Sequence, residues 1–314
     1  MMLSIIIPIY NEENIIDNLF QELLETIKKI SLDVEILVIN DGSDDNTLEV
    51  LQSYLEKIPY LKIINLSRNF GHQAAYMAGL SVAQGDAAVM LDGDLQDPPS
   101  VIPELVKKWQ TGYEVVVAAR KSRKENWLRR LLFYLFHKVF SFLSDYPMPI
   151  HTGMYCLINK RVGLELVNLS ERNRFIPGLR EWLGFKTTFV WYDRDKRLKG
   201  KPKQTLSKLF KLACDAIFSF SYKPLRISLF FGLLISLFSF SYGSILTIQR
   251  LLKIDYVKGF TTPTVAILFL SGVILISIGI MGEYLGRIYD EVKHRPIYII
   301  SDVISFETIS IKNK

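Results

Sequence analysis

Residues 3–45 indicate the fold class, and they read LSIIIPIYNEENIIDNLFQELLETIKKISLDVEILVINDGSDD. The stretch opens with the apolar run 3–9 and closes with the apolar run 34–40, and each run is followed by polar residues. Short apolar runs of this kind predict buried strands, whereas the amphipathic pattern of residues 12–30 predicts a helix. The stretch therefore predicts two strands of a parallel sheet joined by a helix that covers the sheet.

The same alternation continues along the chain and predicts a doubly wound α/β domain. Ligands in such folds bind beyond the carboxyl ends of the strands, so the residues that follow each strand are the first candidates for a site. The remaining expected elements are, in chain order, helix 44–57, strand 61–66, helix 71–83, strand 87–92, helix 99–110 and strand 114–119.

Composition narrows the class of protein. The 314 residues are 49% hydrophobic and 22% charged, which excludes a disordered or fibrous chain. Cys156 and Cys214 lie far apart in the sequence, so they form neither a disulfide framework nor a zinc site by themselves. The net charge of +6 leaves nucleic acid, an anionic membrane and a phosphorylated substrate as possible partners.

Two segments, 225–248 and 263–285, are long and apolar enough to span a bilayer as a helical hairpin. Their alternative interpretation is a pair of buried core helices. The connection 249–262 carries Arg250, Lys253 and Lys258, whereas more positive charges flank the outer ends of the pair. By the positive-inside rule, both outer ends and the N-terminal domain are expected in the cytoplasm. Because the positive charges gather beside the membrane segments, nucleic acid is not expected as a partner.

The N-terminus is expected to carry no signal peptide, because MMLSIIIPIY has no basic region before its apolar run. The expected organisation is a catalytic α/β domain over residues 1–205, an amphipathic juxtamembrane segment 206–224, membrane helices 225–248 and 263–285 joined by an extracytoplasmic loop 249–262, and a cytoplasmic tail 286–314.

Acidic residues follow several of the predicted strands. Asp92 ends the strand 87–92 and Asp94 follows it, and Asp41 follows the strand 34–40. Carboxylates gathered at one edge of a sheet favour a hard cation, Mg²⁺ or Mn²⁺. For Asp44 and Asp45, turn formation and helix capping are the favoured interpretation. The sequence contains no G-x-G-x-x-G after the first strand and no P-loop, which argues against a dinucleotide dehydrogenase and a P-loop NTPase.

These motifs carry a resemblance to a known family. The matching stretches are SIIIPIYNEE, VINDGSDDNT, LSRNFGHQAAYMAGL, MLDGDLQDPP, RNRFIPGLREWLGF, FSFSYKPLR and GIMGEYLGRIYDEVKHRP. Together they resemble the family 2 glycosyltransferases with a GT-A (Rossmann-like) fold, in particular the GtrB type of polyisoprenyl-phosphate glycosyltransferase. That type is related to dolichol-phosphate mannose synthase and to the undecaprenyl-phosphate aminoarabinose transferases.

The resemblance implies transfer of a hexosyl group, with glucose from UDP-glucose expected, to a polyprenyl phosphate such as undecaprenyl phosphate. It implies inversion at the anomeric carbon, on the cytoplasmic face of the bacterial inner membrane. The alternatives are mannose from GDP-mannose, an aminoarabinose from its UDP form, and an inactive membrane scaffold. A processive synthase is not expected, because the Gln-x-x-Arg-Trp motif of such enzymes does not occur. Amphipathic segments beside the hairpin make a homo-oligomer an expected state.

The resemblance also implies the donor side of the site. Asp94, the expected catalytic carboxylate, would hold Mg²⁺ or Mn²⁺ with Gln96 and Asp92, and the ion would stabilise the leaving nucleotide as a Lewis acid. Tyr10 and Glu12 also suit an ordinary strand end and a first helical turn. The residues that match the nucleotide-sugar pocket are Pro8, Tyr10, Glu12, Asp41, Ser43 and Asp92.

Arginines after the strand 114–119 are the candidates for the acceptor phosphate, because a guanidinium matches phosphate oxygens in two-point contacts. They are Arg120, Arg123, Arg129 and Arg130. Residues 127–143 predict a helix at the membrane interface, with a core helix as the alternative. His151 stands where the relatives carry an acid that is the usual candidate base. It is interpreted as a positioning residue, with a catalytic base and a packing residue as the alternatives.

Overall fold

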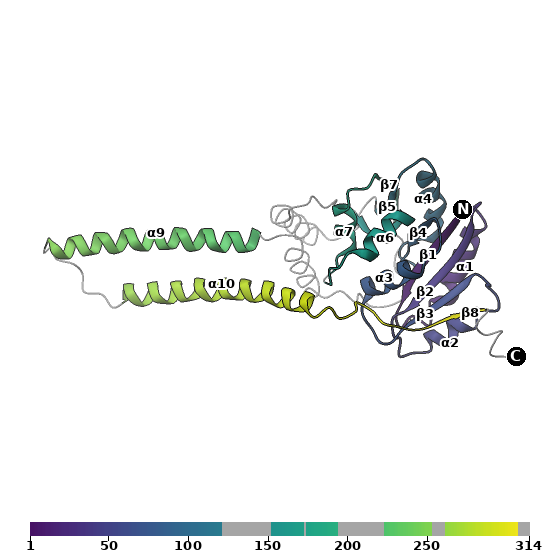
Figure 1. Ribbon diagram of the computed structural model, residues 1–314, viewed down its shortest axis with the longest axis horizontal. Helices are drawn as coiled ribbons and strands as arrows, with labels where there is room; N and C mark the ends of the chain where they lie inside the picture. The colour runs from purple at the N-terminus through teal and green to yellow at the C-terminus, as the bar shows by residue number, and fades with distance from the viewer. Residues whose placement is uncertain (121–151, 173, 194–222, 253–260, 307–314) are drawn as a thin grey trace. The chain divides into compact units, whose positions relative to one another are not determined.

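The computed structural model describes residues 1–120, 152–172, 174–193, 223–252 and 261–306. The chain divides into two compact units. One unit is an α/β sheet domain that includes the residues after 294, and the other contains two long helices (Figure 1). Arg123, Arg129, Arg130 and His151, and the predicted interfacial segment 127–143, lie outside the described residues.

The sheet domain is built on one eight-stranded sheet with strand order β7-β5-β6-β4-β1-β2-β3-β8. Strands β1, β2, β3 and β4 run parallel to their neighbours within this group, as the sequence predicts. The strands are β1 (Met2–Ile9), β2 (Asp33–Asn40), β3 (Leu61–Leu66), β4 (Ala87–Met90), β5 (Val115–Arg120), β6 (Thr152–Asn159), β7 (Thr187–Tyr192) and β8 (Ile300–Ser305).

The sheet is mixed, and its antiparallel strands lie outside the parallel pattern that the sequence predicts. Strand β6 lies antiparallel between β4 and β5, and β7 extends the sheet parallel to β5. At the other edge, β8 pairs antiparallel with β3, so residues 300–305 belong to the sheet. These pairings join segments far apart in the chain, and local apolar patterning carries no information about such partners.

Helices cover both faces of the sheet (Figure 1). Side chains alternate between the faces of a strand, so Leu3, Ile5 and Ile7 of β1 pack in the core that contains Phe20 of α1. On the other face, a Cβ added at Gly79 of α3 would lie 2.3 Å from a methyl group of Ile6, which shows how closely α3 approaches the sheet. The helices of this domain are α1 (Ile16–Ile27), α2 (Thr47–Gln52), α3 (His72–Val82), the short 3-10 turn η1 (Pro99–Val101), α4 (Ile102–Gln110), α6 (Lys160–Asn168) and α7 (Ile176–Trp182).

Two helices begin later than the sequence pattern predicts. Helix α1 begins at Ile16 instead of residue 12, and α2 begins at Thr47 instead of residue 44. The intervening residues form loops because their polar groups bond to one another: the Asp44 amide donates to Asn11 Oδ1 at 2.9 Å. Asp45 Oδ1 accepts from the Thr47 amide at 3.0 Å, the turn-forming role favoured for this residue.

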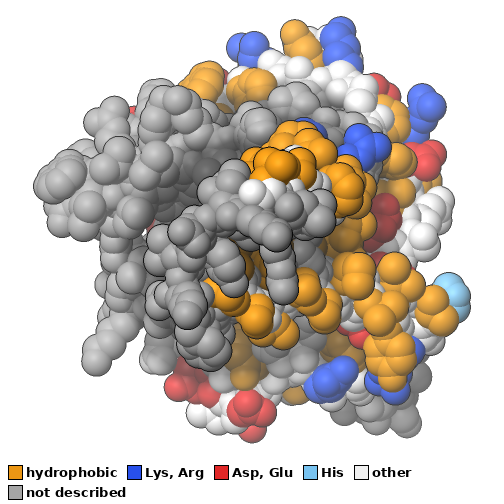
Figure 2. Space-filling view, turned by 90° about the vertical axis from the view of Figure 1, so that its left-hand side faces the viewer, with side chains coloured by type: hydrophobic (Ala, Val, Ile, Leu, Met, Phe, Trp, Pro, Cys, Tyr) orange, Lys and Arg blue, Asp and Glu red, His pale blue; other side chains and the backbone are white. Residues whose placement is uncertain are grey.

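Both apolar segments of the second unit form helices, α9 (Lys223–Leu251) and α10 (Thr261–Val292). Each contains a stretch long and apolar enough to cross a membrane, Leu225–Tyr242 and Phe269–Val292. Ser228 Oγ of α9 donates to Ser277 Oγ of α10 at 2.8 Å. Large apolar side chains are exposed along both helices. On the face drawn in Figure 2, hydrophobic side chains are also exposed. The two helices indicate association with a membrane.

A buried acid ties the amino-terminal ends of the central strands together. The Glu35 carboxylate of β2 accepts hydrogen bonds from Ser4 Oγ at 2.6 Å, from the backbone amide of Gln84 at 2.7 Å and from Lys62 Nζ at 3.0 Å. Burial by itself raises the pKa of Glu35, but these donors favour the carboxylate, and the net effect is a lowered pKa.

We expect Glu35→Gln to lower the free energy of unfolding by about 1–3 kcal/mol at neutral pH, because charge-assisted hydrogen bonds are lost from a buried site. The pKa of Glu35 in the folded protein lies below its ordinary value of 4.5. The advantage of the native chain is therefore complete above that value and is lost as pH falls through the folded pKa. Thermal unfolding of the detergent-solubilised chain at about pH 7 and about pH 3 measures this, and an equal difference at both pH values would contradict it.

Candidate active site

The carboxyl ends of β4, β1 and β2 lie side by side, because these strands are parallel neighbours in the sheet. The loops that follow them contain most of the predicted donor-side residues. The tertiary structure thus gathers at one edge the polar residues that the sequence places after separate strands, as expected for a doubly wound arrangement.

The loops after β1 and β2 are joined by reciprocal hydrogen bonds. Asn11 has a left-handed backbone (φ 52°), and its amide donates to Ser43 Oγ at 3.0 Å. In the second loop, the Ser43 amide donates to Asn40 Oδ1 at 3.1 Å. Tyr10 is 37% exposed, and its hydroxyl lies 3.5 Å from Asp44 Oδ2. The Ser43 hydroxyl, predicted to bind a nucleotide, therefore also sets the position of the first loop.

Asp41 braces a third loop, the one before α3. Its buried carboxylate accepts from the Phe70 amide at 2.8 Å and from the Gly71 amide at 3.0 Å. Burial raises the pKa of Asp41, although the two amides act in the opposite direction. The next residue, Gly42, has φ 66°, and a Cβ there would lie 2.5 Å from the carbonyl carbon of Arg68. Only glycine allows the two loops to approach this closely.

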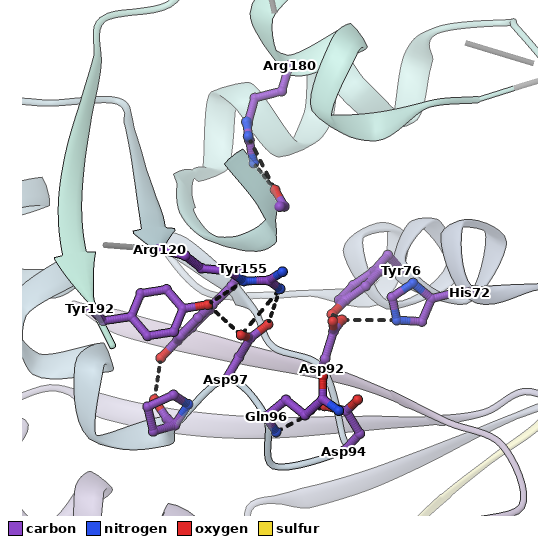
Figure 3. A network of polar contacts seen from close by, with 12 residues as sticks. His72, Tyr76, Asp92, Asp94, Gln96, Asp97, Arg120, Tyr155, Arg180 and Tyr192 are labelled. Carbon is purple, nitrogen blue, oxygen red and sulfur yellow. Dashed lines mark hydrogen bonds and ion pairs between the residues drawn. The ribbon is translucent and has the colours of Figure 1, made fainter. Parts of the chain in front are cut away.

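Asp92 lies in a cluster with two side chains of α3 (Figure 3). Its Oδ1 accepts from the Tyr76 hydroxyl at 2.7 Å and lies 3.0 Å from Nε2 of His72. Burial lowers the pKa of His72, but the hydrogen bond and the charge of Asp92 outweigh it, and the pKa is raised. The pKa of Asp92 is correspondingly lowered, against the effect of its own burial. The pair therefore favours an imidazolium beside a carboxylate.

The predicted metal ligands lie on one short loop after β4. Asp94 Oδ1 accepts a hydrogen bond from the backbone amide of Gln96 at 3.1 Å, and Leu95 between them has φ 56°. Within the described part of the chain, no three His, Cys, Asp or Glu side chains are grouped as a metal cage. Mg²⁺ is commonly held by one or two carboxylates together with phosphate oxygens of a substrate. The oxygen donors of this loop fit that kind of site.

A second cluster surrounds Asp97, which is 1% exposed (Figure 3). Asp97 Oδ2 lies 3.2 Å from Nη2 of Arg120, and Asp97 Oδ1 accepts a hydrogen bond from the Tyr192 hydroxyl. Nε of Arg120 donates to the same hydroxyl at 3.2 Å. Burial lowers the pKa of Arg120, but the charge of Asp97 outweighs it and the pKa is raised. The predicted acceptor-binding residue Arg120 is therefore charged and held in one orientation.

No role is assigned from the sequence to five residues in or beside these clusters: His72, Tyr76, Asp97, Arg180 and Tyr192. His72 and Asp97 lie in motifs that carry the family resemblance, so their positions next to strand ends were a usable signal. Arg180 of α7 is 2% exposed, and both its terminal nitrogens lie 3.5 Å from the carbonyl oxygen of Gly153. Arg180 also lies in one of these motifs, RNRFIPGLREWLGF, whereas nothing local in the sequence marks Tyr192, because its partners Arg120 and Asp97 are distant in the sequence.

The mixed sheet, with helices on both faces and carboxylates beyond the ends of its parallel strands, is of the GT-A type found in glycosyltransferases. Residues 4–164 match the family described as Glycosyl transferase family 2, and residues 223–288 match the GtrB C-terminal hairpin. The chain belongs to glycosyl transferase family 2, which confirms the resemblance seen in its motifs.

The chain is similar to curated proteins over nearly its whole length. It is 44% identical over 312 residues to an uncharacterised glycosyltransferase of Synechocystis sp., covering 99% of this chain and 98% of the relative. It is 42% identical to the uncharacterised glycosyltransferase YkcC of Bacillus subtilis, covering 97% and 94%. It is 39% identical to the bactoprenol glucosyl transferase of Shigella phage SfV, covering 96% and 99%.

We expect Gly42→Ala to destabilise the loops at this edge far more than the matched substitution Gly112→Ala. Both glycines have positive φ, so both substitutions incur the left-handed strain of about 1–2 kcal/mol. Only at Gly42 does the added Cβ also collide with backbone, since nothing lies within 4 Å at Gly112. Melting temperature and amide hydrogen exchange over residues 66–71 measure the difference, and equal effects of the two substitutions would refute it.

Proposed function

We propose that this protein transfers glucose from UDP-glucose to a polyprenyl phosphate such as undecaprenyl phosphate, with inversion at the anomeric carbon. The reaction is placed on the cytoplasmic face of the bacterial inner membrane. The proposal rests on one observation: the same chain contains the family 2 glycosyltransferase domain and the GtrB hairpin. Bactoprenol glucosyl transferases share this whole length at 38–40% identity, which favours the same acceptor class.

The donor is assigned to the edge formed by the loops after β1, β2 and β4. The proposed donor-binding residues are Pro8, Tyr10, Glu12, Asp41, Ser43 and Asp92. The exposed ring of Tyr10 offers an apolar face for a nucleotide base, and the braced loops hold the surrounding polar groups in place. Preorganised groups of this kind bind without a large ordering cost.

Asp94 and Gln96, with Asp92, are the proposed residues for Mg²⁺ or Mn²⁺. His72 and Tyr76 fix the orientation of Asp92, which is the usual role of side chains behind a metal ligand. A bound divalent ion supplies Lewis-acid stabilisation of the charge on the leaving nucleoside diphosphate. The oxygen chemistry of these three residues suits that ion.

The acceptor phosphate is assigned to Arg120. Asp97 and Tyr192 hold its guanidinium, so little conformational freedom is lost when a phosphate binds. A phosphate monoester is already anionic near neutral pH, so its oxygen attacks the anomeric carbon without transferring a proton. The new carbon–oxygen bond forms as the bond to UDP breaks, and His151 is not required as a base.

The direct test is transfer of radiolabelled sugar in membranes that contain the protein and undecaprenyl phosphate. UDP-glucose, GDP-mannose and a UDP-aminoarabinose are supplied separately, and the lipid is extracted with organic solvent. We expect a labelled lipid product from UDP-glucose. Labelling from another donor would correct the sugar, and no labelled lipid from any donor would favour an inactive scaffold.

We expect Asp94→Ala to abolish transfer while leaving the melting temperature unchanged, because this loop carboxylate is proposed to hold the ion and not to support the core. EDTA should abolish transfer by the native protein, and added Mg²⁺ or Mn²⁺ should restore it. An active Asp94→Ala protein together with EDTA-resistant native turnover would refute the metal assignment.

We expect Arg120→Ala to raise the KM for the lipid phosphate about tenfold or more and the KM for the nucleotide sugar much less. A charge-assisted hydrogen bond contributes roughly 1.5–3 kcal/mol, which corresponds to that ratio. The substitution also leaves Asp97 without its cation, so the melting temperatures of the variant and the native protein are compared. Arg120→Lys is tested beside it because it keeps the positive charge. Arg161→Ala on α6, whose guanidinium lies over Phe185, is the control. An equal rise in the KM of both substrates would contradict the assignment of Arg120 to the acceptor site.

A further inference from the structure

Three polar side chains form a row across β2, β3 and β8. In the strand registers Asn40 lies opposite Asn65, and Asn65 lies opposite Asp302. Asn40 Nδ2 donates to Asn65 Oδ1 at 3.1 Å, and Asn65 Nδ2 donates to Asp302 Oδ2 at 2.9 Å. Asn65 and Asp302 are 237 residues apart in the sequence, and Asp302 follows the helical hairpin.

The row ends at the loop assigned to the nucleotide sugar. Asn40 Oδ1 accepts from the amide of Ser43, and Ser43 Oγ in turn accepts from the amide of Asn11. Asp302 is thus connected, through two side-chain amides, to the loops after β2 and β1. All of these residues belong to the sheet domain.

The chemistry of the two ends gives the row a single direction. A carboxylate only accepts hydrogen bonds and a backbone N–H only donates, whereas each asparagine amide has one donating end and one accepting end. Asp302 therefore turns the nitrogen of Asn65 toward β8, and Ser43 turns the oxygen of Asn40 toward the loop. Reversing either amide would place two donors or two acceptors face to face. Asn40 is 4% exposed and Asn65 is 6% exposed, so water cannot readily satisfy a mispaired group.

We propose that Asp302 is a positioning residue for the donor site. It fixes the orientation of Asn65 and Asn40, and through them it holds the backbone at Ser43 in the conformation that the donor requires. The identity of the donor rests on the proposed function above, whereas the connection from Asp302 to the loop does not. A residue of the segment after the hairpin thereby acts at the catalytic edge.

If Asp302 served only to align β8 in the sheet, a different result would be expected. The pairing of β3 with β8 is irregular between Asn65 and Leu66, so Asp302 also lies where the register of β8 is set. If it only aligned β8, its loss would lower the melting temperature without a selective effect on the loop at Ser43. Glu35 provides the comparison, because it is a buried acid that bonds across the amino-terminal end of the same sheet.

The experiment first removes the carboxylate at position 302 and then places a carboxylate at position 65 instead. Asp302→Leu leaves the Nδ2 group of Asn65 without its acceptor. In the double variant Asn65→Asp with Asp302→Asn, the new carboxylate at position 65 accepts from both neighbours, so Asn40 keeps its orientation. Val303→Ala, an exposed neighbour on β8, and Glu35→Gln are the controls.

Two measurements are made on the full chain in detergent: amide hydrogen exchange over residues 41–44, and the KM for each substrate. We expect Asp302→Leu to speed exchange at this loop and to raise the KM for the nucleotide sugar about tenfold, with the KM for the lipid phosphate unchanged. The double variant should restore both quantities to within about twofold. The controls should leave exchange at residues 41–44 as it is in the native chain.

Unchanged exchange at residues 41–44 in Asp302→Leu, or exchange in the double variant as fast as in Asp302→Leu, would overturn the proposal. Hydrogen exchange needs no substrate. If no donor tested supports transfer, exchange still shows whether Asp302 positions the loop, so failure of the proposed function is distinguished from failure of this inference.

Discussion

The parallel pairing of β1 with β2 and β4 is the constraint on which the rest of the structure depends. Parallel strands place all their carboxyl ends at one edge, so the loops that follow them meet there. Strand β1 is buried on both faces, with α1 over one face and α3 over the other, which fixes its register against both neighbours. Loop residues from three separate places in the sequence become neighbours for this reason.

The two ends of this sheet use buried polar groups differently. At the amino-terminal end, Glu35 binds Ser4 and Lys62 and holds the central strands together. At the carboxyl end, the row from the exposed Asp302 through the buried Asn65 and Asn40 continues into a loop of the site. Both arrangements follow from the cost of burying an unpaired polar group, but only the second has one end in a loop that binds substrate in the proposed reaction.

The charged residues of the site are also arranged in pairs. Asp92 lies against His72, and Asp97 lies against Arg120, so each charge is partly compensated before any substrate binds. Buried charges are tolerated in proteins mainly when they are paired in this way. The consequence is that the side chains of both pairs are held in a fixed orientation, which suits a reaction between a sugar nucleotide and a phosphate.

Local sequence patterns predict the four parallel strands, the helices between them, the acids that follow the strands and the two apolar helices. These features follow from apolar periodicity and turn chemistry, which act over a few residues. The tertiary structure alone decided that β6 lies antiparallel between β4 and β5, that β8 closes the edge at β3, and which partners Arg120 and Asn65 have. The contacts of Arg120 with Asp97 and of Asn65 with Asp302 join residues 23 and 237 positions apart. The choice of such partners depends on the packing of the whole sheet, which no local pattern encodes.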